Sequence, residues 1–330
     1  MRRAAALSRQ PNVTAARPYK RVWSLAGRQK QVGGGIVSNV TLTTLIDTTT
    51  LAAHLGDPSV AIVDCRFLLA DEAWGAREYA TRHIPGAVFA HLGRDLSGQP
   101  TGRNGRHPLP EPETLSTTLG RLGIGDDTQV VAYDQDSGMF ASRLWWLLRW
   151  MGHDAVAVLD GGFAQWLADG RPTSAGVEHR AARAFHGSPR ADMTADAATV
   201  ASRIGKNDWR LLDARAPERY RGDVEPIDRV AGHIPSAVNH PFTTNLIAGR
   251  FLDAAHLRET LTRSLGGVPP DRTVCYCGSG VTACHDLLAL EHAGLPGAKL
   301  YPGSWSEWSS DPSRPVETSR DDASGRAKDR

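Results

Sequence analysis

Short runs of β-branched, aliphatic and aromatic residues alternate along the chain with longer segments that read as helices. A run that is apolar throughout is typical of a strand buried on both faces. Residues 142–150, SRLWWLLRW, read as a helix whose tryptophans pack in the core or at a domain interface. Strands that alternate with helices predict an α/β fold with a mainly parallel sheet flanked by helices. The predicted strands centre on residues 62–63, 130–133, 211–212 and 273–276.

Four sequence blocks occur twice and in the same order. Four matched blocks are hard to obtain by chance, and they indicate an internal duplication. The 330 residues also suit two domains of about 100–200 residues each. We therefore expect two tandem domains of the same fold, at residues 43–172 and 196–315, joined by a linker at 173–195. The block pairs are 62–66 with 211–215, 83–88 with 233–238, 130–134 with 273–277, and 160–166 with 301–308.

The N-terminal arm differs from the rest of the chain in charge. Residues 1–36 hold eight Lys or Arg and no acidic residue, which leaves 30 basic against 36 acidic residues in the remainder. A body with net negative charge argues against a nucleic-acid partner. The arm, taken as residues 1–40, is expected to be disordered. There are two alternatives. The arm is a targeting segment, or it is a translated leader and the true start is Val37 or Val40. A polar tail is expected at 316–330.

Composition also bears on compartment and cofactors. No apolar run reaches membrane-spanning length, so a globular body without membrane attachment is expected. Four unevenly spaced cysteines do not suggest a disulfide scaffold in a chain of this length, and they favour a reducing, cytoplasmic setting. Cys275 and Cys277 lack a second ligand pair at metal-binding spacing, so neither a metal nor another cofactor is expected.

The loop at 277–283, CGSGVTA, is the candidate site of chemistry. Cys277 stands where the strand 273–276 turns into a helix, so its sulfur faces unpaired backbone N–H groups and the positive end of the helix dipole. That setting favours the reactive thiolate. Gly278 and Gly280 let the backbone curl around the sulfur. The sequence therefore predicts a cradle for an anionic sulfur species.

The matching position in the first half is Asp134. A carboxylate cannot replace a thiolate nucleophile, so only the second half is expected to be catalytic. The first half then supplies structure and part of the wall of a cleft, which commonly forms between domains and beyond the C-terminal ends of parallel strands.

The repeated blocks and the cysteine loop resemble the two-domain rhodanese-type sulfurtransferases, over roughly residues 43–315. Within that family, the loop is similar to that of the 3-mercaptopyruvate branch, which reads CG(S/T)GVTA. The resemblance implies two rhodanese-like domains. It also implies transfer of a sulfane sulfur, through a persulfide on Cys277, to a thiol or cyanide acceptor, with a thioredoxin-like reductant as a candidate partner. Loop residues expected to contact substrate are Gly278, Gly280, Val281 and Thr282.

The preferred sulfur donor is inferred from charge. Thiosulfate-type relatives carry basic residues just after the cysteine, because a small dianion is best held by cations beside its sulfur. This chain has Gly278 and Ser279 there. Mercaptopyruvate carries its carboxylate several bonds from its sulfur, so its cations should lie across the cleft. The resemblance places them on an Arg-Phe-type motif, matched by Arg219, and on a second arginine, which falls on Asp228 without a gap or on Arg229 with a one-residue insertion.

The resemblance also suggests a hydroxyl–imidazole–carboxylate relay that handles the proton of the departing pyruvate enolate. Ser279 would be the hydroxyl and His83, from the first half, the imidazole. Asp71 and Glu72 are both candidates for the acid. A structural role is the alternative for His83, since His233 occupies the same motif in the other half.

Three other functions share parts of this pattern. Thiosulfate:cyanide sulfurtransferase uses the same cysteine with a different donor. A cysteine-dependent phosphatase needs an arginine at the position held here by Ala283. A sulfur carrier or regulatory module without turnover is the third alternative, and the retained Cys277 loop weighs against it.

Overall fold

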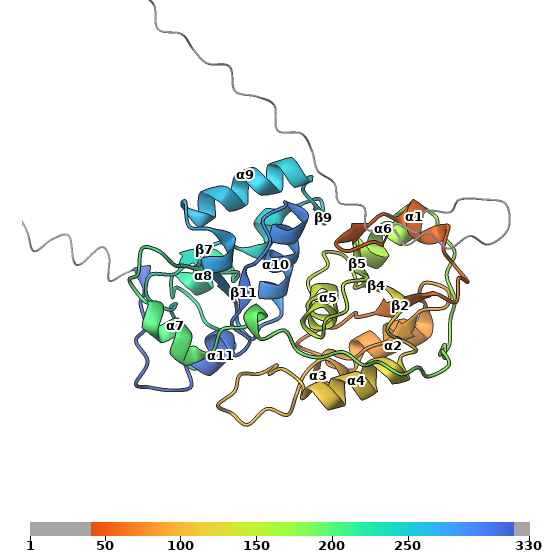
Figure 1. The fold of residues 1–330 in the computed structure, drawn as a ribbon, viewed down its shortest axis with the longest axis horizontal. Coiled ribbons are helices and arrows are strands. Elements are labelled where there is room, and N and C mark those ends of the chain that lie inside the picture. Colours follow the sequence, from red (N-terminus) through yellow and green to blue (C-terminus); the bar gives the residue numbers. More distant parts are fainter. Residues whose placement is uncertain (1–40, 320–330) are drawn as a thin grey trace, which may run out of the picture. The chain divides into compact units, whose positions relative to one another are not determined.

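The fold consists of two α/β halves built on one plan (Figure 1). The computed structural model describes residues 41–319. The expected arm at 1–40, the alternative starts at Val37 and Val40, and the end of the tail lie outside the described residues.

The first half is organised around a sheet in which every strand pairing is parallel, with the order β1-β5-β4-β2-β3. Its central strand β4 pairs with β2 along the full length of both strands. All five residues of β2 are buried, because helices cover both faces of a parallel sheet. The strands are β1 (Leu45–Ile46), β2 (Val60–Asp64), β3 (Val88–Phe89), β4 (Gln129–Tyr133) and β5 (Val156–Leu159).

The second half repeats this order as β11-β10-β6-β7, again with parallel pairings. Thr194 adds a parallel bridge to Leu300 of β11, at the edge that β1 occupies in the first half. The strands are β6 (Arg210–Asp213), β7 (Val238–Asn239), β10 (Thr273–Tyr276) and β11 (Lys299–Leu300), with an antiparallel pair β8 (Leu246–Ile247) and β9 (Arg250–Phe251) outside the sheet. The expected fold class, two tandem copies with mainly parallel sheets, is confirmed.

Helices connect the strands of each sheet. In the first half they are α1 (Thr48–Ala52), α2 (Trp74–Thr81), α3 (Leu92–Asp95), α4 (Pro112–Arg121), α5 (Ala141–Trp150) and α6 (Gly162–Ala168). In the second half they are α7 (Ala197–Arg203), α8 (Pro217–Tyr220), α9 (Ala254–Leu265), α10 (Thr282–His292) and α11 (Ser304–Trp308), with 3-10 turns η1 (Ala191–Met193), η2 (Phe242–Asn245) and η3 (Pro270–Arg272).

A buried ion pair explains one of the repeated sequence blocks. Asp64 ends β2, and its carboxylate accepts hydrogen bonds from the Arg66 guanidinium at 2.6 to 3.1 Å. Asp213 and Arg215 form the same pair after β6. A buried charge needs such a partner, so the Asp-X-Arg spacing is retained in both halves for structural reasons.

Helices α5 and α10 pack against each other and join the two halves. One continuous hydrophobic cluster includes Leu144 and Trp145 of α5, Leu288 of α10, and strand residues from both sheets. Trp145 and Trp146 are almost fully buried, in keeping with the packing role expected for this helix. The core therefore fixes the start of α10, and the cysteine loop before it, relative to the first half.

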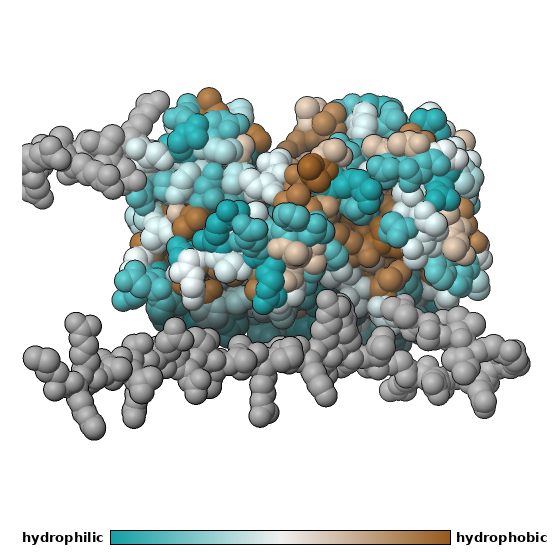
Figure 2. Space-filling model, turned by 90° about the horizontal axis from the view of Figure 1, so that it is seen from above, coloured by the Kyte–Doolittle hydropathy of each residue, from teal (hydrophilic) through white to brown (hydrophobic). Residues whose placement is uncertain are grey.

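Polar residues cover most of the face drawn in Figure 2, and hydrophobic residues form smaller areas between them. Within residues 41–319, every helix is too short or too polar to cross a lipid bilayer.

Truncation of a core residue at the α5–α10 contact should be costly. Leu288 is fully buried in α10, so Leu288→Ala should lower the free energy of unfolding by about 2–5 kcal/mol, from lost burial and the cavity left behind. Urea denaturation measures this directly. Leu68 is 44% exposed, and Leu68→Ala should change stability by no more than about 0.5 kcal/mol. Equal losses in the two variants would contradict the packing described.

Candidate active site

The cysteine loop connects the end of β10 to the start of α10, as predicted. Cys277 follows Tyr276 directly and is 2% exposed. Gly280 has a φ of +75°, and a Cβ at this position would lie 2.5 Å from the carbonyl oxygen of Pro302. Both its left-handed backbone and this close approach require glycine, which explains the second glycine of the motif.

Groups outside the loop hold its carbonyl oxygens. The backbone N–H groups of Trp305 and Ser306 donate to the carbonyls of Cys277 and Gly278, each at 2.9 Å. The Arg143 guanidinium donates to the carbonyl of Gly280 at 2.9 Å. With the carbonyls turned outward, the backbone N–H groups of residues 278–283 donate to no other group in the described part of the chain. They remain available to an anion at the helix start.

The first half shows this type of cradle with an anion in it. Asp134 follows β4 as Cys277 follows β10. Its carboxylate accepts hydrogen bonds from the backbone N–H groups of Gly138, Phe140 and Ala141 at 2.7 to 3.1 Å. Burial raises the pKa of Asp134, and these N–H groups oppose the rise by stabilising the carboxylate. The strand-to-helix turn therefore directs several backbone N–H groups at one side chain in the copy that lacks cysteine.

The helix start is not closed by a side chain in the second half. Val281 is the N-cap of α10 and makes no capping hydrogen bond, and Thr282 is the first helical residue.

The imidazole beside Ser279 belongs to His107 and not to His83. His107 Nδ1 lies 2.8 Å from Ser279 Oγ. His83 is fully buried elsewhere, with its ring stacked on Tyr79 and Nδ1 2.7 Å from the Tyr79 carbonyl oxygen. His233 makes the same contacts with Tyr220 in the second half. His83 thus holds the repeated motif together, and the expectation that it reaches Ser279 is corrected.

Neither acid considered for the relay reaches His107. Asp71 is paired with Arg77. Glu72 contributes its backbone carbonyl to a contact with His91 at 3.1 Å. Among the described residues, no carboxylate is a hydrogen-bond partner of His107. Burial lowers the pKa of this histidine to about 3, with Arg143 and Arg106 adding to the effect. The imidazole is therefore neutral at physiological pH.

Arg143 places a buried positive charge under the loop. It is fully buried and donates to the carbonyls of Gly280, His107 and Pro108 at 2.9 to 3.2 Å. Burial lowers its pKa, and the sulfurs of Cys284 and Cys277 act in the opposite direction. The charge of this buried guanidinium is compensated mainly by the carbonyl dipoles that accept its hydrogen bonds.

Two arginines flank the residue after the cysteine. Arg106 Nη2 and Arg219 Nη1 lie 3.1 and 3.5 Å from the position that a Cβ would take on Gly278. Arg219 was expected across the cleft from the loop and instead lies beside Gly278. Arg106 comes from the first half and was not anticipated. Arg229 is exposed, and Asp228, the ungapped alternative, contacts both arginines.

These residues enclose a cavity of about 220 Å³ lined by both halves. Its first-half residues include Arg106, His107 and Phe140, and its second-half residues include Cys277, Gly278, Ser279, Val281, Thr282 and Arg219. A sulfur-bearing small molecule placed here would meet a cysteine, a hydroxyl–imidazole pair and the guanidiniums of Arg106 and Arg219.

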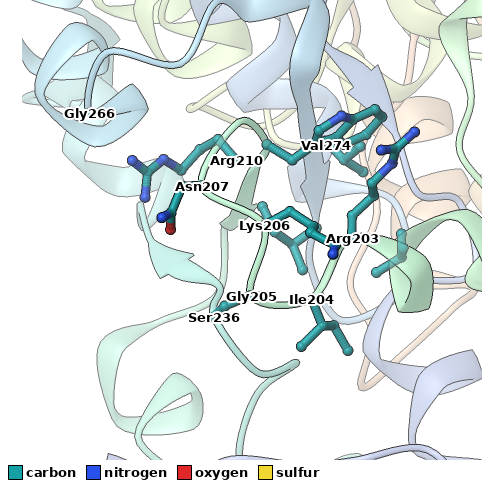
Figure 3. Close-up of a pocket in the computed structure, with 12 residues that line it drawn as sticks. Arg203, Ile204, Gly205, Lys206, Asn207, Arg210, Ser236, Gly266 and Val274 are labelled. Carbon is teal, nitrogen blue, oxygen red and sulfur yellow. The ribbon is translucent and has the colours of Figure 1, made fainter.

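A larger cavity of about 310 Å³ lies beside the first residues of β6 and β10, at the opposite end of those strands (Figure 3). Arg203, Lys206 and Arg210 contribute to its wall, and its lining contains no cysteine or histidine. The smaller cavity is the better candidate for chemistry, because it alone of the two contains a nucleophile. Within residues 41–319, no group of three or more His, Cys, Asp or Glu is arranged to hold a metal ion.

Two residues that the sequence analysis missed, His107 and Arg143, could have been found from the sequence. A residue that is identical in both copies, as His83 and His233 are, is more simply explained by a structural role that both halves share. This argument disfavours His83 and favours His107, which stands outside the repeats in a glycine-containing loop. Arg143 is a charged residue in the first turn of a helix rich in Leu and Trp, a pattern that marks a specific buried partner.

The chain matches the model of the rhodanese-like domain twice, over residues 47–169 and 196–311. It is 51% identical over 271 residues to a probable 3-mercaptopyruvate sulfurtransferase of Pseudomonas aeruginosa, covering 81% of this chain and 95% of that protein. It is 42% identical to a putative thiosulfate sulfurtransferase of Mycobacterium tuberculosis, covering 79% and 91%. The crystal structure of a 3-mercaptopyruvate sulfurtransferase from Escherichia coli superposes with a TM-score of 0.70 at 32% identity, covering 80% and 99%.

The chain therefore belongs to the rhodanese family, with two tandem rhodanese-like domains. Its relatives carry the names of 3-mercaptopyruvate and thiosulfate sulfurtransferases, and it is an enzyme of the sulfurtransferase class.

The low pKa of His107 should appear in the pH dependence of stability. Between pH 6.5 and about 3, the unfolded chain protonates this imidazole and the folded chain does not. Stability contributed by His107 is thus complete above pH 6.5 and falls on acidification, by up to about 1.4 kcal/mol per pH unit. Urea denaturation at several pH values from 7 to 4 gives the slope of the unfolding free energy against pH. In His107→Gln this slope should be shallower by about this amount. The exposed His256 offers a control, and His256→Gln should not reduce the acid-side slope.

Proposed function

We propose that the protein transfers a sulfane sulfur from 3-mercaptopyruvate to a thiol or to cyanide, through a persulfide on Cys277. The observation that carries the proposal is the row of open backbone N–H groups at 278–283 around a cysteine. Its counterpart in the first half already holds the carboxylate of Asp134. A site that stabilises an anion at this position suits both a thiolate and the persulfide anion that follows it.

In the first step, the Cys277 thiolate attacks the sulfur of the donor. A bond forms between the two sulfurs, the carbon–sulfur bond of the donor breaks, and its electron pair passes to the enolate of pyruvate. The thiol proton of the donor ends on the methyl carbon of pyruvate. The products are pyruvate and the Cys277 persulfide anion, so charge and protons balance without a further reactant.

Ser279 and His107 are the proposed carriers of that proton. Their contact of 2.8 Å allows the hydroxyl and a neutral imidazole to accept a proton from the donor thiol and return it to the enolate. His91 is close enough to lower the pKa of His107 further, and among the described residues no carboxylate is a hydrogen-bond partner of His107. The relay proposed for this chain therefore consists of two groups.

In the second step, an acceptor thiol or cyanide attacks the outer sulfur, and the Cys277 thiolate leaves. With cyanide the products are thiocyanate and free enzyme. A small thiol or a thioredoxin-like protein is the proposed acceptor, in a reducing, cytoplasmic compartment. The free state of all four cysteines supports that compartment.

Thiosulfate is the alternative donor. Arg106 and Arg219 beside Gly278 provide the kind of charge that a small dianion uses, although the loop itself carries none. The name of the relative from Mycobacterium tuberculosis also favours this donor. We place mercaptopyruvate first because the site holds a hydroxyl–imidazole pair, which thiosulfate cleavage does not need.

The persulfide is tested by mass spectrometry. After incubation with 3-mercaptopyruvate and removal of excess donor, the wild-type protein should gain the mass of one sulfur on the peptide containing Cys277. Cys277→Ser should gain none and should lose turnover. Cys65→Ala, which removes a buried cysteine of the first half, is the matched control and should gain sulfur like wild type. Sulfur uptake by Cys277→Ser equal to that of wild type would reject the assignment.

The proton relay is tested by comparing leaving groups. Ser279→Ala should lower kcat for 3-mercaptopyruvate by about 100-fold, within the range typical of general acid–base groups. It should affect thiosulfate cleavage much less, because sulfite departs as a stable anion without protonation. Steady-state rates with both donors give the comparison. An equal loss with both donors would show that Ser279 shapes the cradle and does not handle a proton.

A further inference from the structure

Arg106 and Arg219 share one buried carboxylate. Asp228 Oδ2 accepts a hydrogen bond from Arg219 Nη2 at 3.1 Å, and Asp228 Oδ1 pairs with Arg106 Nη1. The Asp228 side chain is 5% exposed, whereas that of Arg106 is 31% exposed. The contact therefore joins a cation from each half to one buried anion at the edge of the cavity.

A second carboxylate completes the charge balance. Glu225 accepts from Arg219 at 2.7 Å and from the backbone N–H groups of Ile227 and Asp228, each at 3.1 Å. Glu225 also pairs with Arg215 at 3.4 Å, and Arg215 is paired with Asp213. The three carboxylates and three guanidiniums of this group sum to no net charge. Removal of Glu225 or Asp228 would leave one positive charge in excess beside Gly278.

The geometry fixes Arg106 at this place. Its backbone N–H donates to Ser306 Oγ at 3.1 Å, and the Ser306 N–H donates to the carbonyl of Gly278. A Cβ on the preceding Gly105 would lie 2.7 Å from the carbonyl oxygen of Gly303. The loop of the first half thus lies directly against the segment that supports the cysteine loop.

We propose that Asp228 determines donor selectivity by neutralising Arg106 and Arg219 beside the cysteine loop. The inference rests on the proposed function and adds to it a residue that excludes one class of donor. Asp228 is a specificity-determining residue here, and it takes no part in bond breaking.

The selectivity follows from where each donor carries its charge. Thiosulfate has two negative charges on the group directly bonded to the transferred sulfur, so both must lie next to Gly278 and close to Asp228. Mercaptopyruvate has one charge, and three bonds separate its sulfur from the carboxylate carbon. Repulsion by a fixed carboxylate is about twice as large for a dianion as for a monoanion at the same distance, and larger again at shorter range.

The experiment compares kcat/KM for thiosulfate and for 3-mercaptopyruvate in wild type and Asp228→Asn. The ratio of thiosulfate to mercaptopyruvate should rise about tenfold or more, because a like-charge contact with the dianion is removed. An unchanged or lower ratio would overturn the proposal. If wild type uses neither donor, the proposed function fails instead, which separates the two claims.

Two further variants exclude structural explanations. The double variant Asp228→Asn with Arg106→Gln removes one charge of each sign and should return the ratio towards wild type. A ratio that stays high would mean that the single substitution had only loosened the site. Asp223, an exposed residue of the same loop paired with Arg221, gives the matched control, and Asp223→Asn should leave the ratio within about twofold. An equal rise of the ratio in Asp223→Asn would mean that overall charge alone explains the effect, and it would overturn the proposal.

One measurement needs no variant. Sulfate and pyruvate resemble the charged parts of the two donors, and both can be tested as competitive inhibitors of the wild-type enzyme. Pyruvate should inhibit at lower concentration than sulfate. The reverse order would contradict a site that disfavours dianions.

Discussion

The site depends on a buried guanidinium that has no carboxylate partner within residues 41–319. Arg143 extends from a helix of the first half, and its donors go to carbonyl oxygens on both sides of the contact between the halves. Among these is Gly280, whose carbonyl must point away from the sulfur if the neighbouring N–H groups are to face it. One side chain thus orients the cradle, fixes the backbone at His107 and brings positive charge under the cysteine. Burying an arginine in this way is expensive, and the carbonyl dipoles around it offset the cost.

The two halves use the same turn in different ways. In the first, the N–H groups at the start of α5 are occupied by Asp134, a covalently attached anion that no substrate can displace. In the second, Cys277 leaves the corresponding groups open. The repeated blocks that maintain this geometry are structural, as the buried Asp–Arg pairs and the stacked histidines show. Conservation of a block between the copies therefore reports on folding, and differences between the copies report on chemistry.

Much of this could be predicted from the sequence. The strands, the duplication and the position of Cys277 between β10 and α10 follow from apolar runs and glycine placement, which are local properties. The partner of Ser279 is not local, because His107 reaches it from a loop with no helical or strand period across 172 residues of chain. His83 was predicted to be the imidazole beside Ser279. It stands in the repeated block 83–88, where its ring stacks on Tyr79. Arg106 escaped notice for the same reason as His107, and the uncharged loop at Gly278 proved to have two cations beside it.

The docking of the Arg106–His107 segment against Gly303 and Ser306 has a consequence for how such a chain can be divided. Cut at the segment between the domains, the C-terminal piece would keep its cysteine but lose the imidazole, one guanidinium and the arginine that orients the loop. The duplication thus did not yield two independent units, one working and one spare. In the proposed mechanism the first half supplies part of the site, so neither piece alone would contain all the groups that the mechanism uses.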